Sequence, residues 1–529
     1  MLSITVALLA VVIALWLTWR RRNFTYFKRH NIPGPPPSLL FGNFVEILKK
    51  GQLQCQKEWI EKYGRVLGYY FGIQPILLIA EPDLLRQIQQ KDFHKFVNRP
   101  RIFDISRAAA EYNEESLTQI RSKKWKEVRS IITPTFTTSK LKTMNPIIRK
   151  TVDELMEAVD KKASEGNVFN IYPLYQNLTM DAISRTSLGI HTNAQTNPEE
   201  PFVRMGRAFF SLNMSSLFLI SFCFPELAWL AAMWRKLLLS FRNQGTYPRK
   251  ELRDVAYGVI QARKSDPMLR RSDLLQLMID AKTNETSVSD KDLTAADDDQ
   301  ASEDVSSGGD SRNALKMTDE EVAQNSALFL LAGYETTSTA LAFTTHLLAH
   351  HPEVQEKIRS ELNEYIQGSE EGLTYEILNK LQYLDQVLSE SLRLYPPIIF
   401  FVNREASTDV VYGKLKIPKG ASIQVPVYFL HHDPTFWNNP EEFNPDRFSP
   451  ENKKKHDSMV FQPFGAGPRN CVGMRFARME AKMALAKLLQ KYKLSPKPGS
   501  REEDLDITQS VFNMRPGKGI NIRVEKVKR

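Results

Sequence analysis

The stretch FQPFGAGPRNCVGMRFARMEAKMALAKLL, residues Phe461–Leu489, joins a loop rich in glycine and proline to a long helical pattern. A single cysteine, Cys471, stands where the loop passes into the helix. The only other cysteines, Cys55 and Cys223, are far away in sequence, which argues against a disulfide framework and for a reducing compartment. A thiolate is a metal ligand or a nucleophile, and a helix N-terminus lowers the pKa of a cysteine placed beside it.

The residues around the cysteine follow the pattern F-x-x-G-x-R-x-C-x-G, with Phe464, Gly467, Arg469, Cys471 and Gly473. Glycines allow the backbone to fold tightly beneath a flat ligand, and the arginine offers a guanidinium to an anion beside a metal. Two alternatives are a buried structural cysteine and a cysteine nucleophile, but the chain shows no family signature of the latter. The pattern favours haem ligation by the Cys471 thiolate.

The N-terminus predicts a membrane anchor. Residues 1–19, MLSITVALLAVVIALWLTW, contain no charged side chain, and Arg20, Arg21 and Arg22 follow at once. As a helix these residues span about 28 Å, close to the thickness of a bilayer core. A cleaved signal peptide is the alternative, but its positive n-region and small-residue cleavage site are missing. The positive-inside rule places the rest of the chain in the cytosol.

Composition along the chain predicts one large domain with an anchor, a hinge and an insertion. We expect the anchor at 1–22, a proline-rich hinge at 23–38 and the catalytic domain at 39–529. Within that domain, residues 285–310 hold nine acids, one lysine and no aromatic residue, which predicts a disordered surface insertion. The net charge of +10 suits a membrane surface or an acidic partner, and no pattern indicates nucleic-acid binding.

Secondary-structure patterns are mainly helical. Residues 64–82 predict a two-stranded hairpin, and residues 413–429 predict further strands. Thr318 and Glu321 form a capping box at the start of a helix that Pro352 ends, and this helix is apolar nearly all round. Its segment AGYETT, at 332–337, combines glycine and threonines, which predicts a kink or bulge.

The stretch around Cys471 resembles the haem-binding signature of the cytochromes P-450, and WKEVRSIITPTFTTSKLK resembles the family-three clan of animal microsomal members. The resemblance implies a mostly α fold with small β-sheets, a triangular helical body and a long central helix over the haem, preceded by one transmembrane helix. It implies a membrane-anchored monooxygenase of the endoplasmic reticulum, with its catalytic domain in the cytosol. The expected cofactor is haem b held by Cys471, and O2 would be split with electrons from NADPH.

The same resemblance implies partners and a substrate class. NADPH–cytochrome P-450 reductase would deliver the electrons, cytochrome b5 is a second candidate donor, and the substrate would be a lipophilic small molecule. Residues 101–120 and 215–234 would shape the substrate entrance. The expected reductase-docking residues are Lys123, Lys124, Lys126, Lys140 and Lys142, and a solvated basic face is the alternative.

Site residues are carried over motif by motif. Glu335 and Thr336 would be the catalytic acid and alcohol on the distal side. The residues expected to bind the cofactor are Phe464, Arg469, Trp125, Arg129, Arg99 and Arg404. Glu390 and Arg393 of ESLRLYPP, with Arg447 of FNPDRF, would form a buried structural triad.

Three other functions stay open at this point. A haem-thiolate isomerase or dehydratase would need no reductase, and the Glu335–Thr336 pair argues against it. A non-catalytic haem sensor or carrier would not consume NADPH. A cysteine hydrolase would work without haem.

Overall fold

The computed structural model describes residues 2–100, 115–197, 199–210, 222–227, 229–230, 233–234, 237, 248–271, 273–280, 283–284, 314–315, 317–366, 372–400, 402–509 and 513–527. The predicted acidic insertion at 285–310 lies outside these residues. So do residues 101–114 of the first predicted entrance segment, and residues 215–221, 228 and 231–232 of the second.

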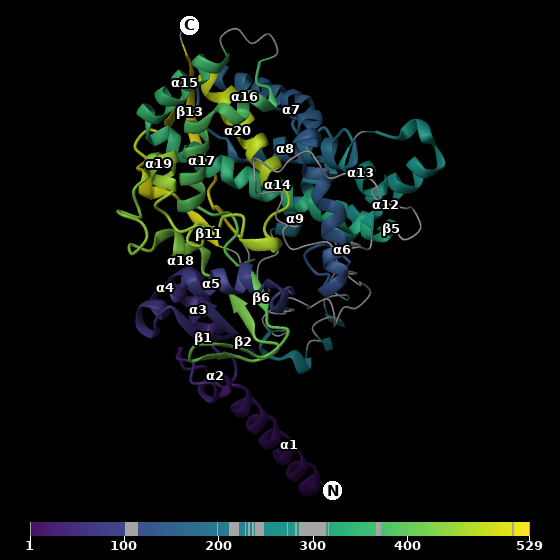
Figure 1. Cartoon of the computed structure of the whole chain (residues 1–529), viewed down its shortest axis with the longest axis vertical. Coiled ribbons are helices and arrows are strands. Elements are labelled where there is room, and N and C mark those ends of the chain that lie inside the picture. The colour runs from purple at the N-terminus through teal and green to yellow at the C-terminus, as the bar shows by residue number, and fades with distance from the viewer. Residues whose placement is uncertain are drawn as a thin grey trace.

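The described chain is mostly helical, as predicted (Figure 1). The helices of the first half are α1 (Leu2–Asn23), α2 (Tyr26–Arg29), α3 (Phe44–Lys50), α4 (Gln52–Tyr63), α5 (Pro82–Arg86), α6 (Ser122–Ile132), α7 (Thr138–Ser164), α8 (Tyr172–Ile183), α9 (Pro201–Phe210) and α12 (Pro248–Ser265). Those of the second half are α13 (Leu274–Asp280), α14 (Asp319–His350), α15 (Pro352–Ile366), α16 (Tyr375–Lys380), α17 (Gln382–Leu394), α18 (Val427–His432), α19 (Pro450–Lys453) and α20 (Met474–Lys491).

The strands form small sheets. Four of them, β1 (Val66–Phe71), β2 (Gln74–Ile79), β9 (Ser422–Gln424) and β6 (Asn403–Glu405), lie side by side in that order. The others are β10 (Tyr492–Pro496) with β13 (Asn521–Lys526) and β3 (Phe169–Asn170), β11 (Ile507–Gln509) with β12 (Met514–Pro516), β7 (Val410–Tyr412) with β8 (Leu415–Ile417), and β4 (Thr283–Asn284) with β5 (Ala314–Leu315). The predicted hairpin at 64–82 is confirmed as β1–β2, with Val66 opposite Ile79.

Helix α14 runs through the core. The predicted capping box is present, because the Thr318 side chain accepts from the Glu321 amide and the Glu321 carboxylate accepts from the Thr318 amide. The expected bulge at 332–337 is absent, since the helix is continuous α from Asp319 to His350, and the expected kink stays a prediction. Gly333 has a packing reason instead: a Cβ there would meet the Ile183 side chain of α8 at 3.0 Å.

Two apolar cores meet along the chain. The larger one gathers α7, α8, α14, α17 and α20, and the smaller one lies around the β1–β2–β9–β6 sheet and α4. The helical and sheet parts lie at opposite ends of the body, and α1 projects beyond the sheet end (Figure 1). Among the described residues, α1 is the one helix long and apolar enough to cross a membrane, by length and composition, and almost all of it is exposed.

The strand prediction for residues 413–429 was only partly right. Strands β8 and β9 lie within it, but Val427 begins α18, which ends at His432. The sequence VPVYFLHH has no alternation that distinguishes a buried helical turn from a strand. Tertiary contacts decide it, because His431 is fully buried and its Nε2 accepts from the Gln462 amide.

Candidate functional site

The loop before α20 presents Cys471 through two glycines with left-handed backbone conformations. Gly465 has a φ of 75° and Gly467 a φ of 69°. A Cβ on Gly467 would lie 1.9 Å from the carbonyl oxygen of Gln89, so only glycine fits there. The Cys471 amide donates to the Phe464 carbonyl at 2.8 Å, which closes the loop.

Cys471 differs from the other two cysteines in its surroundings. It is exposed within a loop that packs on the core, whereas Cys55 and Cys223 are buried. Burial raises the pKa of the Cys55 thiol to about 12 and that of Cys223 to about 11, so both stay protonated at neutral pH. Of the three, Cys471 is the thiol available to a ligand.

Four arginines from separate elements lie near this loop. Arg129 comes from α6, Arg404 from β6 and Arg469 from the loop itself, and each is at most 5% exposed. Arg99, from the segment after α5, is partly buried. Their proximity is shown by their pKa values, because each of Arg99, Arg404 and Arg469 is affected by the charge of at least one other member.

The hydrogen bonds of these arginines hold the site in shape. Arg129 donates to the carbonyl and the side-chain oxygen of Asn470, at 3.2 and 2.8 Å, beside Cys471. Arg404 donates to the Ala466 carbonyl at 2.9 Å. Arg469 donates to the carbonyls of Val97, Leu117 and Ile120 at distances of 2.8, 3.2 and 3.1 Å.

The pKa values of Arg99, Arg404 and Arg469 indicate that an anion would stabilise this group of guanidiniums. Burial, then repulsion by Arg129, lowers the pKa of Arg99 to about 10, and burial, then repulsion by Arg99, lowers that of Arg404 to about 9. Burial and the neighbouring guanidiniums also bring the pKa of Arg469 well below its ordinary value. The Cys471 thiol partly offsets the lowering of the Arg99 pKa.

Trp125 and Phe464 frame the same region. The Trp125 ring is 1% exposed and lies under the Arg469 guanidinium, at 4.1 Å from ring centroid to Cζ. Phe464 is partly buried, and the guanidinium of Arg478 lies 5.5 Å from its ring centroid. The structure therefore brings together Cys471, Phe464, Trp125 and the four arginines that the sequence singled out.

Helix α14 exposes a short patch in its middle. Ala332 is exposed and Gly333 and Thr336 are partly exposed, although nearly every other residue of the helix beyond its first turn is buried. The Thr336 hydroxyl donates to the Ala332 carbonyl at 2.6 Å. An exposed alcohol in the middle of a core helix marks a surface that the protein leaves open.

Glu335 lies on a different face of α14 from this patch. It is 2% exposed and accepts from the Tyr172 hydroxyl at 2.8 Å and from the Gln176 side chain at 3.2 Å, both on α8. Arg515 of β12 lies 3.9 Å from the same carboxylate. Burial raises the pKa of Glu335, and these three neighbours oppose that rise. No hydrogen bond joins Glu335 to the Thr336 hydroxyl among the described contacts, so the expected pair is adjacent in sequence but not joined.

Tyr172, Gln176 and Arg515 were missed by the sequence analysis. They are far from Glu335 in the sequence, so no spacing between neighbouring residues indicates that they would contact it. The one available signal was the acid itself, since a buried carboxylate in an apolar helix needs donors from somewhere.

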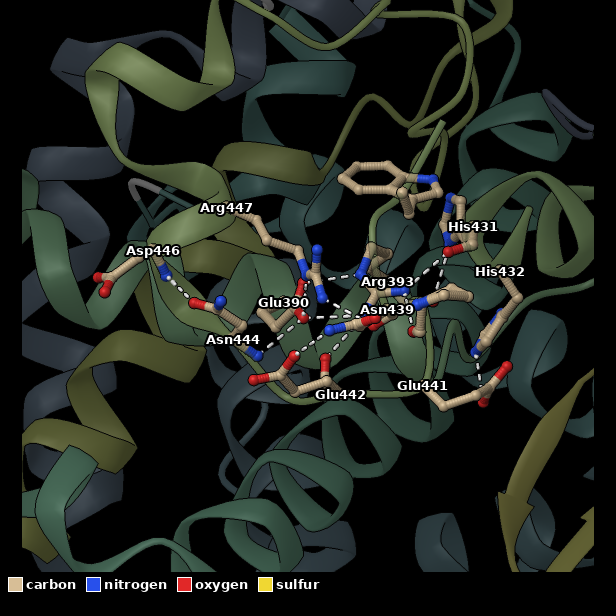
Figure 2. A network of polar contacts seen from close by, with 12 residues as sticks. Glu390, Arg393, His431, His432, Asn439, Glu441, Glu442, Asn444, Asp446 and Arg447 are labelled. Carbon is tan, nitrogen blue, oxygen red and sulfur yellow. Dashed lines mark hydrogen bonds and ion pairs between the residues drawn. The ribbon is translucent and has the colours of Figure 1, made fainter. Parts of the chain in front are cut away.

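Glu390, Arg393 and Arg447 form a compact buried network (Figure 2). Arg393 binds both carboxylate oxygens of Glu390, at 2.7 and 2.8 Å, and Arg447 Nε reaches Oε1 at 3.2 Å. The Asn444 amide donates to the same Oε1 at 3.0 Å. Arg393 also donates to the carbonyls of His431, Pro440 and Glu442. The network therefore ties α17 to α18, to the loop before η9 (Pro445–Phe448) and to η9 itself.

Three of the five predicted docking lysines already have acidic partners. Lys124 lies 2.5 Å from Glu321 and Lys142 lies 2.8 Å from Glu376. A third, Lys123, is 3.6 Å from Glu127 of its own helix and stays highly exposed. The basic face is thus partly neutralised within the chain.

A haem fits the residues that the structure assembles. A porphyrin has a metal that takes a thiolate and two propionate carboxylates that need cationic donors. Cys471 is an exposed thiol among buried guanidiniums, and the Arg404 Nε atom is buried with no hydrogen-bond partner among the described residues. The described residues contain no cluster of three or more His, Cys, Asp or Glu side chains that would hold a bare metal ion.

Comparison with known proteins gives a consistent result over nearly the whole chain. The family model of cytochrome P450 matches residues 32–522. Cytochrome P450 3A5 of Homo sapiens is 34% identical over 494 residues, which cover 92% of this chain and 90% of that protein. Cytochrome P450 3A11 of Mus musculus is 34% identical over 502 residues, which cover 93% of this chain and 91% of that protein. Cytochrome P450 3A6 of Oryctolagus cuniculus is 35% identical over 495 residues, with 92% and 90% covered.

Proposed function

Because this chain belongs to the cytochrome P450 family, we propose that it is a membrane-anchored haem-thiolate monooxygenase acting on lipophilic small molecules. The observation that carries the proposal is the exposed thiol of Cys471 beside guanidiniums that burial and mutual repulsion have made less basic. Bound haem would supply the chemistry of dioxygen activation, in which one oxygen atom enters the substrate and the other becomes water.

Cys471 would be the proximal ligand, and its loop fits that role. The two left-handed glycines and the amide bond to the Phe464 carbonyl hold the sulfur in one place. A preset position matters because a ligand that has to be ordered on binding loses affinity to conformational entropy. Phe464 and Trp125 would bound the cofactor on the same side.

Arg99, Arg129, Arg404 and Arg469 would bind the two carboxylates of the cofactor. Arg99, Arg404 and Arg469, whose pKa values are lowered, would then gain a counter-charge, since an opposite charge within about 4–6 Å favours the charged form of a group. The hydrogen bonds that these residues already make to backbone carbonyls orient the guanidiniums before the cofactor arrives.

Thr336 and Glu335 would serve the distal side in different ways. Thr336 has a partly exposed hydroxyl that can hold a water molecule and pass its proton. Glu335 is a buried acid of raised pKa, held by Tyr172 and Gln176, which suits a proton store behind the site. A rotation of the Glu335 side chain would be needed to bring its carboxyl toward Thr336.

Electrons would come from NADPH through NADPH–cytochrome P-450 reductase, with cytochrome b5 as a second donor. Helix α1 would anchor the protein in the endoplasmic reticulum membrane, with residues 23–38 as the hinge and 39–529 as the catalytic domain in the cytosol. The exposed Lys123 on α6 fits contact with an acidic partner.

The first test is the carbon-monoxide difference spectrum of the reduced, purified protein beside its Cys471→Ser variant. We expect a strongly red-shifted Soret band in the parent and its loss in the variant, because a thiolate ligand causes the shift. Cys55→Ser is the matched control, since that cysteine is buried far from the loop and should leave the band unchanged.

Turnover separates the proposed reaction from its alternatives. A monooxygenase converts its lipophilic substrate only when NADPH and reductase are both present, whereas a haem-thiolate isomerase or dehydratase converts its substrate without NADPH or reductase. A folded protein with no haem band would exclude the proposal altogether.

A further inference from the structure

The three consecutive arginines at the end of α1 have different environments. Arg21 and Arg22 are exposed, as expected for residues that follow an apolar helix, but Arg20 is fully buried. A guanidinium is costly to remove from water unless its donors are satisfied. The partners of Arg20 therefore show which segments the end of α1 is bonded to.

Arg20 binds two segments that are far apart in the chain. It donates to the carbonyls of Leu39 and Leu40 at 2.9 and 2.5 Å, and to the carbonyl of Cys223 at 2.9 Å. Its Nη1 also lies 3.4 Å from the Glu226 carboxylate. One side chain thus joins α1 to the loop before α3 and to the described residues 222–227.

Aromatic rings enclose the same guanidinium. The Trp16 and Phe224 rings lie 4.9 and 5.0 Å from the Arg20 Cζ atom, and the two rings stack on each other. The Trp16 Nε1 donates to Glu226 at 2.5 Å. Phe224 also meets Phe41 edge to face, at 5.7 Å between centroids. Such cation–π contacts are strongest where water is excluded.

A second connection lies one turn further along. The Asn23 side chain donates to the Ile73 carbonyl at 2.8 Å, and the Ile73 amide donates to the Phe222 carbonyl at 3.3 Å. The turn between β1 and β2 is therefore bonded to both α1 and the 222–227 segment. Two independent sets of bonds make a rigid joint more than a flexible tether.

The segments that meet at this joint carry exposed apolar side chains. From the loop before α3 and from α3 come Leu40, Phe41, Val45 and Leu48, and from the segment after Glu226 come Leu227, Trp229, Leu230, Met233, Trp234 and Leu237. Soluble surfaces seldom gather so many large apolar residues in one place. Basic side chains that are exposed beside them, Arg21, Arg22, Lys28 and Arg29, suit the phosphates of lipid headgroups.

We propose that Arg20 is a latch that fixes α1 to the catalytic body, so that the apolar residues around the joint form one surface that faces the lipid bilayer. The inference rests on the membrane-anchored function proposed above. The occupant is a bilayer because the apolar helix α1 leaves the body at this surface (Figure 1), and because the apolar patch and the basic residues lie at its base. The latch would set the depth of Leu227 and its neighbours, whereas a free anchor would leave that depth variable.

The test uses the full-length, haem-loaded protein in phosphatidylcholine vesicles that contain some phosphatidylserine. A fluorophore placed on Leu227→Cys reports its depth through quenching by lipids that carry a spin label near the headgroup. The native Cys55 and Cys223 are buried, and labelled protein without the Leu227 substitution supplies the background. The comparison is between Arg20→Gln and Arg21→Gln, which remove the same charge from neighbouring positions.

We expect strong quenching in the parent and in Arg21→Gln, and loss of most of it in Arg20→Gln, although the latter still floats with the vesicles. Equal quenching in both variants would overturn the latch, and an unquenched parent would overturn the bilayer-facing surface. If Arg20→Gln fails to fold, Trp16→Leu with Glu226→Gln takes its place, with the same two outcomes. The carbon-monoxide band and NADPH consumption of each sample test the proposed function separately.

Discussion

Two buried groups of arginines in this molecule are built on opposite principles. Around Glu390, each of Arg393 and Arg447 reaches a carboxylate and several backbone carbonyls, so the network is complete within the chain (Figure 2). Around Cys471, Arg129, Arg404 and Arg469 reach carbonyls and one amide oxygen, and burial with mutual repulsion lowers the pKa values of Arg99, Arg404 and Arg469. The first arrangement stabilises the fold by itself, and the second would be completed by the carboxylates of the proposed haem.

The largest expected effect breaks the complete network. Glu390→Gln leaves two buried guanidiniums without their carboxylate, which should lower the free energy of unfolding by about 3–5 kcal/mol. Urea unfolding followed by circular dichroism measures it. The control is Glu503→Gln, which breaks an exposed ion pair with Arg501 and should have no measurable effect. A small loss in Glu390→Gln would mean that the carbonyls alone satisfy the two arginines.

A smaller effect is expected for Arg404→Gln, which should weaken haem binding without lowering the stability of the haem-free protein. Haem should leave this variant about tenfold faster, because one carboxylate loses a donor, a change of about 1.4 kcal/mol. The unfolding free energy of the haem-free protein should not fall, since a cation repelled by Arg99 has been removed.

Haem transfer to an excess of a haem-scavenging protein measures the first quantity, and urea unfolding of the haem-free protein measures the second. The matched control is Arg121→Gln, because Arg121 is already paired with Glu405 at 2.5 Å and should keep its haem. Destabilisation of the haem-free Arg404→Gln protein would erase the contrast between the two groups.

The smallest expected effect concerns Glu335. This buried acid is intermediate between the two groups, because neighbouring donors offset the effect of burial only in part. Its pKa is raised by burial and held down by the Tyr172 hydroxyl, so Tyr172→Phe should raise it further. A carboxyl whose folded pKa is raised stabilises the protein below its unfolded pKa and loses that contribution as pH rises through the folded pKa. In the variant this loss should therefore continue to a higher pH and be larger in total.

Infrared titration of the protonated carboxyl band measures this pKa directly, with Glu335→Gln to assign the band. Tyr175→Phe is the matched control, because its hydroxyl bonds Thr345 on the same pair of helices and does not touch Glu335. An unchanged band in Tyr172→Phe would show that Gln176 and Arg515 alone set the pKa.

Local sequence patterns correctly predicted features that depend on one short stretch of the chain. The pattern around Cys471 predicted the family, which the comparisons confirm, and Thr318 with Glu321 predicted the start of α14. The mostly helical fold class was also predicted. Local pattern failed at Val427, where a short buried run has no period that separates strand from helix. It also failed near Gly333, where the helix has no bulge and close packing against Ile183 explains the glycine.

The amino-acid sequence by itself determined the thiol, the glycines that present it, the apolar α1 and the acid–alcohol pair, because each depends on residues close together in the chain. Tertiary structure alone decided which charges meet. It turned Glu335 toward Tyr172, gathered four arginines from separate elements near Cys471, and buried Arg20 while leaving Arg21 in solvent. The physical reason is that burial and Coulomb interactions depend on distance in space, and distant segments of a chain carry no local sign of their partners.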